Sequence, residues 1–209
     1  REGVKVLHAV AELCGHSFTL KHVPFGAAAY FSHGSPFPEE TKAVCDAADA
    51  IVKGPVGLSV DKMDAIPWEH RPEAGAILPL RARYDTFANY RPVYLPGALA
   101  GFSPLRPEVI GEGIDILMIR ELVGGIYFGE KVEGEETGFA YAADNCVYKR
   151  AEVERIARVA FREAEGKGGL LTNVHKSNVL ATSRFWRKIV EEIAPDYPAV
   201  TCRSMLVDN

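Results

Sequence analysis

One amphipathic helix, followed by an apolar strand-like run, most constrains the fold of this chain. Between Glu152 and Glu165 the apolar side chains share one helical face. Gly168 and Gly169 end this helix, and Leu170 to Val174 has the length and composition of a strand. A second amphipathic helix is predicted from Ser183 to Ala194 and a last strand from Val200 to Val207. Strands that alternate with helices indicate an α/β fold with an open, mostly parallel or mixed sheet.

Helices and strands are also predicted to alternate in the rest of the chain, although the hydrophobic patterns there are weaker. Residues 129–143 are acidic and rich in glycine, with aromatic residues on both sides, which predicts a mobile loop or a protruding hairpin. We expect helices over residues 1–13, 38–48 and 76–84, strands over 16–23, 50–52, 87–93 and 114–119, and loops over 26–38 and 54–70.

Composition excludes several classes of protein. The 209 residues are 47% hydrophobic and 25% charged, which is enough for one domain or two small ones. A net charge of −4 without a basic run argues against nucleic-acid binding. No apolar stretch approaches the ~18 residues of a membrane span, and the first residues do not read as a signal peptide. The four cysteines are far apart and form no CxxC pair, so reduced thiols in a cytoplasmic protein are expected.

Familiar catalytic motifs are missing from the sequence. No GxGxxG follows a predicted strand, so a Rossmann dinucleotide site is not indicated. A P-loop, a GxSxG and an HExxH are equally absent, and the six histidines show no metal-ligand spacing. Any catalytic chemistry must therefore use other residues.

Basic residues stand at the ends of several predicted elements. In open α/β sheets ligands gather at the carboxyl ends of strands, and arginines placed there bind carboxylates through paired N–H bonds. Each residue, taken singly, can equally be a surface cation beside an acidic neighbour. The residues concerned are Arg81, Arg91, Arg120 and Lys176.

Tyr127, Lys176 and Asp208 each have a possible catalytic role and also a purely structural explanation. Tyr127 follows the flexible pair Gly124-Gly125 and can donate a proton beside cationic groups, or can be a half-buried aromatic residue at a strand edge. Lys176 is a candidate base if neighbouring positive charge lowers its pKa, or an exposed lysine in a turn. Asp208, at the end of the last strand, suits Mg²⁺ or Mn²⁺, or caps a following helix.

Several stretches together resemble the isocitrate/isopropylmalate dehydrogenase family, along nearly the whole chain. The Arg-Glu-Leu-Val-Gly-Gly-Ile-Tyr-Phe-Gly run is specific, and it occurs together with the lysine and final aspartate motifs. The matching stretches are His33-Gly34-Ser35-Pro36, Arg71-Pro72-Glu73, Arg81, Ala88-Asn89-Tyr90-Arg91-Pro92, Arg120 to Gly129, Lys176-Ser177-Asn178-Val179-Leu180 and Met205-Leu206-Val207-Asp208-Asn209.

This resemblance implies a two-domain α/β enzyme without a Rossmann motif that carries out metal- and NAD-dependent oxidative decarboxylation of a 2-hydroxy acid. Arg81, Arg91 and Arg120 would then hold the substrate carboxylates. Tyr127 would protonate the enol after CO₂ loss, and Lys176 would serve in proton removal from the hydroxyl. Asp208 would bind Mg²⁺ or Mn²⁺ in the partner's site. Glu73 and Asn178 would lie near the nicotinamide of NAD.

The residues before Arg81 bear on the choice of substrate. Isocitrate members of the family have polar residues there, whereas this chain has Gly75, Ile77 and Leu78. An aliphatic pocket favours the isopropyl group of 3-isopropylmalate, an intermediate of leucine biosynthesis, because an additional carboxylate would stay unpaired there. Two stretches point to other substrates of the family. The tartrate and D-malate members resemble this chain at Leu78-Pro79-Leu80-Arg81, and the isocitrate branch resembles it at His175-Lys176, so tartrate, D-malate and isocitrate remain alternative substrates. A non-catalytic regulatory subunit is an alternative of another class.

The resemblance also implies a domain organisation. Residues 1–91 would belong to the large cofactor domain, and residues 92–209 to a dimerisation and substrate domain whose arm, residues 129–147, exchanges with a partner in a homodimer with a shared active site. Family members begin with a Gly-Asp-Gly-Ile-Gly-Pro-Glu-like segment and continue well past the residue equivalent to Asp208. We therefore expect this chain to be truncated at both ends relative to them.

Overall fold

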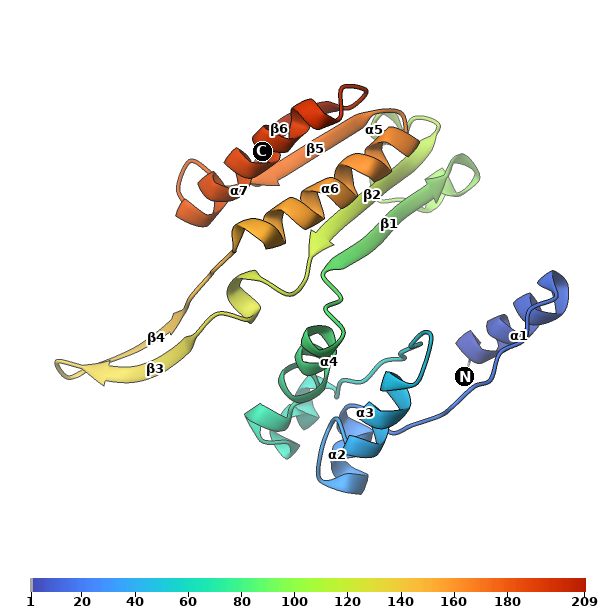
Figure 1. Ribbon diagram of the computed structural model, residues 1–209, viewed down its shortest axis with the longest axis vertical. Coiled ribbons are helices and arrows are strands. Elements are labelled where there is room, and N and C mark those ends of the chain that lie inside the picture. Colours follow the sequence, from blue (N-terminus) through green and yellow to red (C-terminus); the bar gives the residue numbers. More distant parts are fainter. Residues whose placement is uncertain (1) are drawn as a thin grey trace. The chain divides into compact units, whose positions relative to one another are not determined.

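A computed structural model describes residues 2–209, and its chain divides into two compact units, residues 1–80 and 81–209 (Figure 1). The domain boundary that the sequence predicts at 91/92 remains a prediction. In the structure β1 (Ala88–Pro96) is one continuous strand that crosses this position. Whether the two units serve as a cofactor domain and a dimerisation domain remains a prediction.

Unit 1 is helical in the part that the structure describes. Its α-helices are α1 (Glu2–Cys14), α2 (Ala27–His33), α3 (Glu39–Asp46) and the start of α4 (Leu78–Arg83), and its shorter helices are η1 (Val60–Ala65), η2 (Trp68–His70) and the π-helix η3 (Pro72–Ile77). Phe37 and Ile66 are among its buried residues. The buried Thr41 hydroxyl donates to the carbonyl of Pro24 at 2.7 Å, which ties α3 to the preceding loop.

Three expectations for unit 1 were wrong. Residues 16–23 and 50–52 form no strand, because the described part of unit 1 offers them no partner strand and an unpaired strand leaves its backbone groups without a ladder. Residues 26–38 are not all loop: Ala27 to His33 are helical. Gly34, at φ +71°, ends that helix in the left-handed conformation.

Unit 2 contains the strands, which form three two-stranded sheets in the described residues. The other elements of the unit are η4 (Gly97–Phe102), α5 (Pro107–Ile110), η5 (Gly125–Tyr127), α6 (Arg150–Gly166), α7 (Ala181–Ile193) and η6 (Ala194–Asp196). Antiparallel pairs join β1 to β2 (Gly113–Glu121) and β3 (Lys131–Glu136) to β4 (Phe139–Asp144), and β5 (Leu170–His175) is parallel to β6 (Thr201–Leu206). One open sheet was expected, whereas here β2 and β5 are not hydrogen-bonded to each other.

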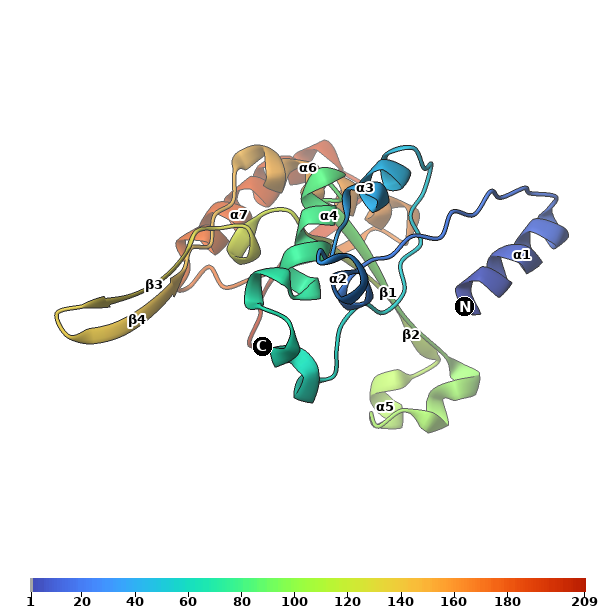
Figure 2. The ribbon, with the colours of Figure 1, turned by 90° about the horizontal axis from the view of Figure 1, so that it is seen from below.

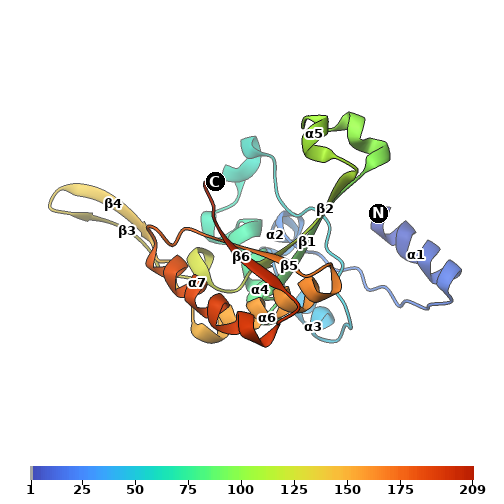
Figure 3. The same ribbon diagram turned by 90° about the horizontal axis from the view of Figure 1, so that it is seen from above.

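The core of unit 2 lies between α6 and α7, which run side by side in Figure 3. Phe161 is fully buried and stacks on Tyr197 with the ring centroids 4.9 Å apart. Ile189 and Val190 of α7 belong to the same buried cluster as Phe161. The predicted helices, the last two strands and the strand pair at residues 87–119 are therefore present, with boundaries shifted by a few residues.

The segment at 129–147 is a hairpin of β3 and β4 that projects from the rest of unit 2 (Figure 2). All six residues of β4 are exposed, and Phe139 is 76% exposed. Of the two structures that the sequence allowed, a loop or a hairpin, the described residues form the hairpin.

Candidate active site at the carboxyl end of β2

Two of the candidate arginines lie on one face of the β1–β2 ribbon. Arg91 is paired with Met118, and Arg120 lies two residues further along β2. Because side chains alternate along a strand, Arg91, Met118 and Arg120 point to the same face. A diagonal pair of this kind lies about 7–8 Å apart, so the two guanidinium groups can approach one anion.

Arg81 shares the electrostatic environment of these two arginines. Partial burial lowers the pKa of Arg81 most, followed by the positive charge of Arg120, while Tyr127 acts in the opposite direction and Arg91 adds a smaller lowering effect. Guanidinium groups remain protonated despite such shifts. Three positive charges that repel one another create a site that an anionic ligand stabilises.

Tyr127 lies beside this cluster, with the Arg120 guanidinium 5.8 Å from its ring centroid. About half of the tyrosine is exposed. It belongs to the short helix η5, which follows β2 without any intervening regular element. The phenol is therefore accessible to a ligand that the arginines hold.

The turn that leads to Tyr127 is held by Glu121, whose side chain is only 1% exposed. Its carboxylate accepts the backbone N–H of Val123 at 3.1 Å and that of Gly124 at 2.8 Å. An ionised carboxylate that accepts backbone N–H groups forms strong, charge-assisted hydrogen bonds. The buried acid therefore fixes the direction in which the chain leaves β2.

Close packing and a lysine fix the remainder of the turn. Gly125 has φ +77°, and a Cβ there would lie 2.4 Å from the hydroxyl oxygen of Tyr148, so neither the conformation nor the space suits another residue. Burial raises the pKa of the Tyr148 phenol, which stays neutral. On the other side, the Lys131 ammonium donates to the carbonyls of Ile126 and Tyr127, each at 3.0 Å.

Arg155 of α6 connects this turn to the beginning of β1. It lies 3.8 Å from the Glu121 carboxylate and 2.6 Å from that of Asp85. Its guanidinium also covers the Phe87 ring at 4.3 Å from the centroid. The Arg155 guanidinium therefore compensates the buried charge of Glu121 and connects α6 to the end of β2 and to the residues just before β1.

Sequence reasoning assigned no role to four of these supporting residues. Glu121 carried a usable signal, since an acid at the end of an apolar strand, just before a Gly-Gly pair, can accept the free N–H groups of the turn. The roles of Tyr148 and Arg155 depend on contacts between distant segments, whereas Lys131 donates to carbonyls only a few residues before it. The four residues are Glu121, Lys131, Tyr148 and Arg155.

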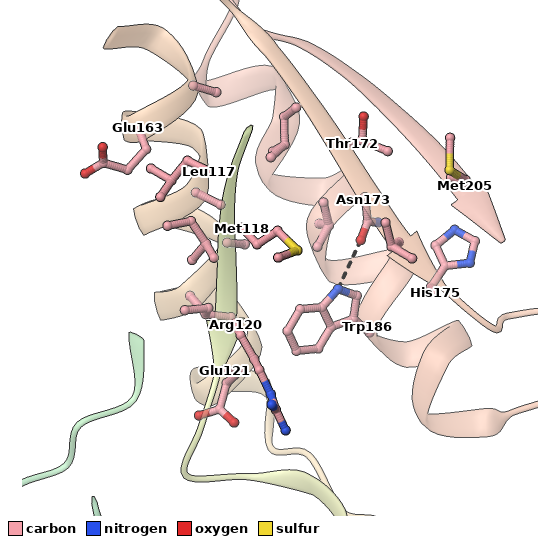
Figure 4. Close-up of a pocket in the computed structure, with 18 of the residues that line it drawn as sticks. Leu117, Met118, Arg120, Glu121, Glu163, Thr172, Asn173, His175, Trp186 and Met205 are labelled. Atoms are coloured by element: carbon pink, nitrogen blue, oxygen red, sulfur yellow. Dashed lines mark hydrogen bonds between the residues drawn. The ribbon is translucent and has the colours of Figure 1, made fainter. Parts of the chain in front are cut away.

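A groove of about 1010 Å³ runs between β2 and β5 (Figure 4). Helices α6 and α7 contribute Ile156, Ala160 and Trp186 to its lining. Arg120 and Tyr127 line it where β2 ends, and His175 lines it where β5 ends. The carboxyl ends of the two strands therefore meet at one end of the groove, which is where ligands bind in open α/β sheets.

Lys176 and Asp208 form an ion pair with the charged atoms 2.6 Å apart. The hydrogen bond from Lys176 is the main reason that the pKa of the Asp208 carboxyl lies below its ordinary value, and the backbone N–H of Asp208 adds to it. The neighbour of Lys176 is therefore a carboxylate rather than the positive charge expected from the sequence. In this arrangement the lysine is an ammonium, which donates protons and accepts none.

The described residues do not form a complete metal site. They contain no group of three His, Cys, Asp or Glu side chains arranged to hold an ion. Asp208 offers one carboxylate, and that carboxylate is already paired with Lys176. Mg²⁺ takes about six ligands in an octahedron and usually keeps several waters, so the other ligands would have to come from water, substrate or another segment.

The remaining predicted site residues are separated from this cluster along the chain. Glu73, Ile77 and Leu78 belong to unit 1, in the helical segments η3 and α4 that lead to Arg81, and Glu73 is exposed. Asn178 is exposed two residues after Lys176, so its amide is accessible to a carboxamide such as that of nicotinamide. The structure brings together Arg81, Arg91, Arg120 and Tyr127, and separately Lys176 and Asp208.

Comparison with known proteins decides the family. The profile described as isocitrate/isopropylmalate dehydrogenase matches residues 1–209. The chain belongs to this family. It is 47% identical to a 3-isopropylmalate dehydrogenase of Bacillus licheniformis over 99% of the chain and 55% of the relative. It is 43% identical to that of Escherichia coli over 100% of the chain and 57% of the relative.

Solved structures support the same family fold. An isocitrate dehydrogenase from Methylococcus capsulatus superposes with a TM-score of 0.78 at 26% identity, over 98% of this chain and 56% of that one. The TT0538 protein from Thermus thermophilus gives a TM-score of 0.77 at 25% identity, over 100% of this chain and 39% of that one. The α/β fold expected from the sequence is therefore confirmed. The chain spans about half the length of the family members it matches.

A titration tests the Lys176–Asp208 pair. In Lys176→Met the pKa of the Asp208 carboxyl should rise towards the ordinary value of about 3.9, because its main hydrogen-bond donor is gone. Carboxyl ¹³C NMR against pH measures this change. A pKa below the unfolded value adds stability above that value, and this contribution is lost as the pH falls through the folded pKa.

Lys188→Met serves as the matched control for this titration. Lys188 pairs with Glu192 on α7 and makes no bond to Asp208, so the Asp208 titration should stay as in the parent. An Asp208 pKa that Lys176→Met leaves unchanged would show that the pair does not form in solution.

Proposed function

We propose that the enzyme containing this chain oxidises and decarboxylates 3-isopropylmalate with NAD and a divalent metal ion. The family consists of decarboxylating dehydrogenases, and the supporting observation is the cluster of Arg81, Arg91 and Arg120 around Tyr127. The chain covers 55% of the Bacillus licheniformis relative, so the activity is proposed for the enzyme as a whole. Its location in the cytoplasm remains a prediction.

Different residues of this chain would carry out different steps of the reaction. The three arginines bind the two carboxylates of the substrate and orient its hydroxyl-bearing carbon. NAD, if bound beside that carbon, would supply the hydride acceptor. Lys176 takes the hydroxyl proton, for which it must first pass its own proton to solvent water and leave its pairing with Asp208. After one C–C bond breaks and CO₂ leaves, the Tyr127 phenol gives a proton to the carbon that lost the carboxylate.

Asp208 is the partner that Lys176 must leave in this scheme. A ligand that takes the carboxylate for itself would free the Lys176 side chain to turn towards the substrate.

Ile77 and Leu78 support 3-isopropylmalate as the substrate. These two aliphatic residues precede Arg81 in the helical segment that ends at Arg83. An apolar wall rewards a branched hydrocarbon group and leaves an additional carboxylate without a partner. The names of the relatives that are 43% and 47% identical agree with this choice. Tartrate, D-malate and isocitrate are the alternatives, and a regulatory subunit would have no use for both Tyr127 and Lys176.

Substrate preference tests the proposal. NAD reduction should be compared for 3-isopropylmalate, isocitrate, D-malate and tartrate with Mg²⁺ or Mn²⁺ present. We expect 3-isopropylmalate to have the highest kcat/KM, because one methylene or methyl group in an apolar pocket contributes roughly 10–200-fold. A higher kcat/KM for another of these acids would refute the substrate and keep the reaction class, whereas no turnover of any of them would refute both.

Replacing Tyr127 by phenylalanine tests its part in proton transfer. We expect kcat to fall about 10²–10⁴-fold, the usual contribution of one general acid. KM should change far less, because the ring remains beside Arg120. Tyr94→Phe, on an exposed tyrosine of β1, is the control and should keep the parental kcat. A Tyr127→Phe enzyme with the parental kcat would show that the phenol has only a packing role.

The β3–β4 hairpin supports the proposal of a homodimer with a shared active site. Its aromatic residues Phe139 and Tyr141 are exposed on a projecting ribbon that is too thin to bury them. A second copy of the chain would cover them, and a two-fold axis would make the exchange reciprocal. Asp208, which lacks a local carboxylate partner for a metal, would then act in the neighbouring subunit's site.

Mixed dimers test the shared site. An Asp208→Asn subunit combined with a Tyr127→Phe subunit should regain activity, because Asp208 would enter the neighbouring site together with its ion-pair partner Lys176, and one of the two sites in the heterodimer would then contain all three intact residues. Activity of the mixture is compared with that of each parent. Heterodimers that form and stay as inactive as their parents would show that Asp208 acts within its own subunit.

A further inference from the structure

Arg155 of α6 lies between two segments that carry residues of the candidate site. Its Nη1 group donates to the Asp85 carboxylate at 2.6 Å, and its Nη2 group lies 3.8 Å from the Glu121 carboxylate. Asp85 follows the helix α4, which carries Arg81. Glu121 precedes the turn that leads to Tyr127. One guanidinium group therefore has a contact in each of the two segments.

The turn at Asp85 is built on the last residues of α4. Asp85 has φ +45°, a left-handed conformation that is uncommon outside glycine and that aspartate and asparagine tolerate best. Its N–H donates to the carbonyl of Ala82 at 3.4 Å, and the N–H of Thr86 donates to the carbonyl of Arg81 at 3.1 Å. The position of the Asp85 carboxylate is therefore tied to the backbone of Arg81.

Glu121 has the corresponding part on the other side, at the end of β2 (Figure 4). Its buried carboxylate accepts the N–H groups of Val123 and Gly124. A buried charge depends on a compensating partner, which here is Arg155. A change at Arg155 therefore reaches the turn that leads to Tyr127.

A cleft of about 400 Å³ separates the two segments. Ala82 and Asp85 line it from one segment, Val123 and Phe128 line it from the other, and Arg155 is among its remaining lining residues. Because this space is open, direct packing across the cleft does not fix how far apart the segments lie. The ion pairs of Arg155 span the distance instead.

The surroundings of Arg155 suit an arginine better than a lysine. Its guanidinium covers the ring of Phe87, whose carbonyl accepts the N–H of Leu122 at 2.9 Å. Its Nε atom is buried without a hydrogen-bond partner among the described residues, which is unfavourable. The two carboxylates and the ring offset this cost. A lysine has a single charged atom and no planar group, so it cannot replace the fork and the stacking together.

We propose that Arg155 is a positioning residue that couples Arg81 to Tyr127. Through Asp85 it holds the end of α4, and through Glu121 it holds the turn after β2. The residue that binds a substrate carboxylate and the residue that donates a proton thereby keep a fixed separation. The coupling is reciprocal, so loosening one contact loosens the other. This inference rests on the proposed roles of Arg81 and Tyr127.

Amide hydrogen exchange in the enzyme that contains this chain tests the coupling. Asp85→Asn removes one charge and keeps a residue that tolerates the left-handed conformation. The amides of Val123 and Gly124 bind Glu121 rather than Asp85, and yet they should exchange roughly two- to fivefold faster in this variant. The upper limit is the contribution of one partly exposed ion pair to an equilibrium, since exchange follows local opening. In Glu121→Gln the Thr86 amide should likewise exchange faster.

Binding of malonate, a dicarboxylate that needs no turnover, connects the coupling to the site. Calorimetric titration should give a Kd that rises roughly two- to fivefold in Asp85→Asn and further in Arg155→Lys, whose ammonium cannot pair with both acids. Arg158→Lys and Asp196→Asn are the matched controls, because Arg158 lies on the same helix and pairs with Asp196 at 3.0 Å. Both controls should keep the parental exchange rates and the parental Kd.

Two results would overturn the proposal. The first is parental exchange at Val123 and Gly124 in Asp85→Asn, and the second is faster exchange there with parental affinity for malonate. Asp85→Asn keeps the test decisive if circular dichroism shows Arg155→Lys to be unfolded. A parent enzyme that binds no malonate would refute the arginine cluster of the proposed function, and the exchange rates would still decide whether Arg155 couples the two segments.

Discussion

A buried carboxylate at the end of β2 is the interaction on which the candidate site depends. Glu121 accepts two backbone N–H groups of the turn and is compensated by Arg155. A buried charge without partners is costly, so the carboxylate, the turn and α6 stabilise one another only when all are in place. Arg120 and Tyr127 lie on either side of this turn, and its geometry decides whether both reach the same ligand.

The charges of the site serve two different purposes. Partial burial and then the positive charges of Arg120 and Arg91 lower the pKa of Arg81, so the empty cluster is unfavourable and the proposed dicarboxylate would relieve it. Lys176 and Asp208 instead neutralise each other as an ion pair. In the proposed mechanism, substrate binding and proton transfer therefore fall to separate groups, the arginines and the Lys176–Asp208 pair.

Much of the fold was predictable from the sequence where local patterns and packing agree. The helix over 150–166 has an apolar stripe that its environment buries, and the strand after Gly169 follows from an apolar run. Residues 16–23 have a similar alternation and form no strand, because pairing depends on a partner that the pattern does not contain. The arginines and Tyr127 were singled out by their positions in the sequence and remain predicted site residues, whereas Arg155 and Tyr148 act through contacts made only in the folded chain.

Whether Glu121 holds the turn before Tyr127 is tested most directly by the amide exchange rates of Val123 and Gly124 in Glu121→Gln. The substitution keeps the shape of the side chain and removes the charge that these N–H groups bind. Both amides should exchange faster than in the parent, while the exposed Glu133→Gln in the hairpin leaves them unchanged. Parental exchange rates at Val123 and Gly124 in Glu121→Gln would contradict the dependence of the site on this carboxylate.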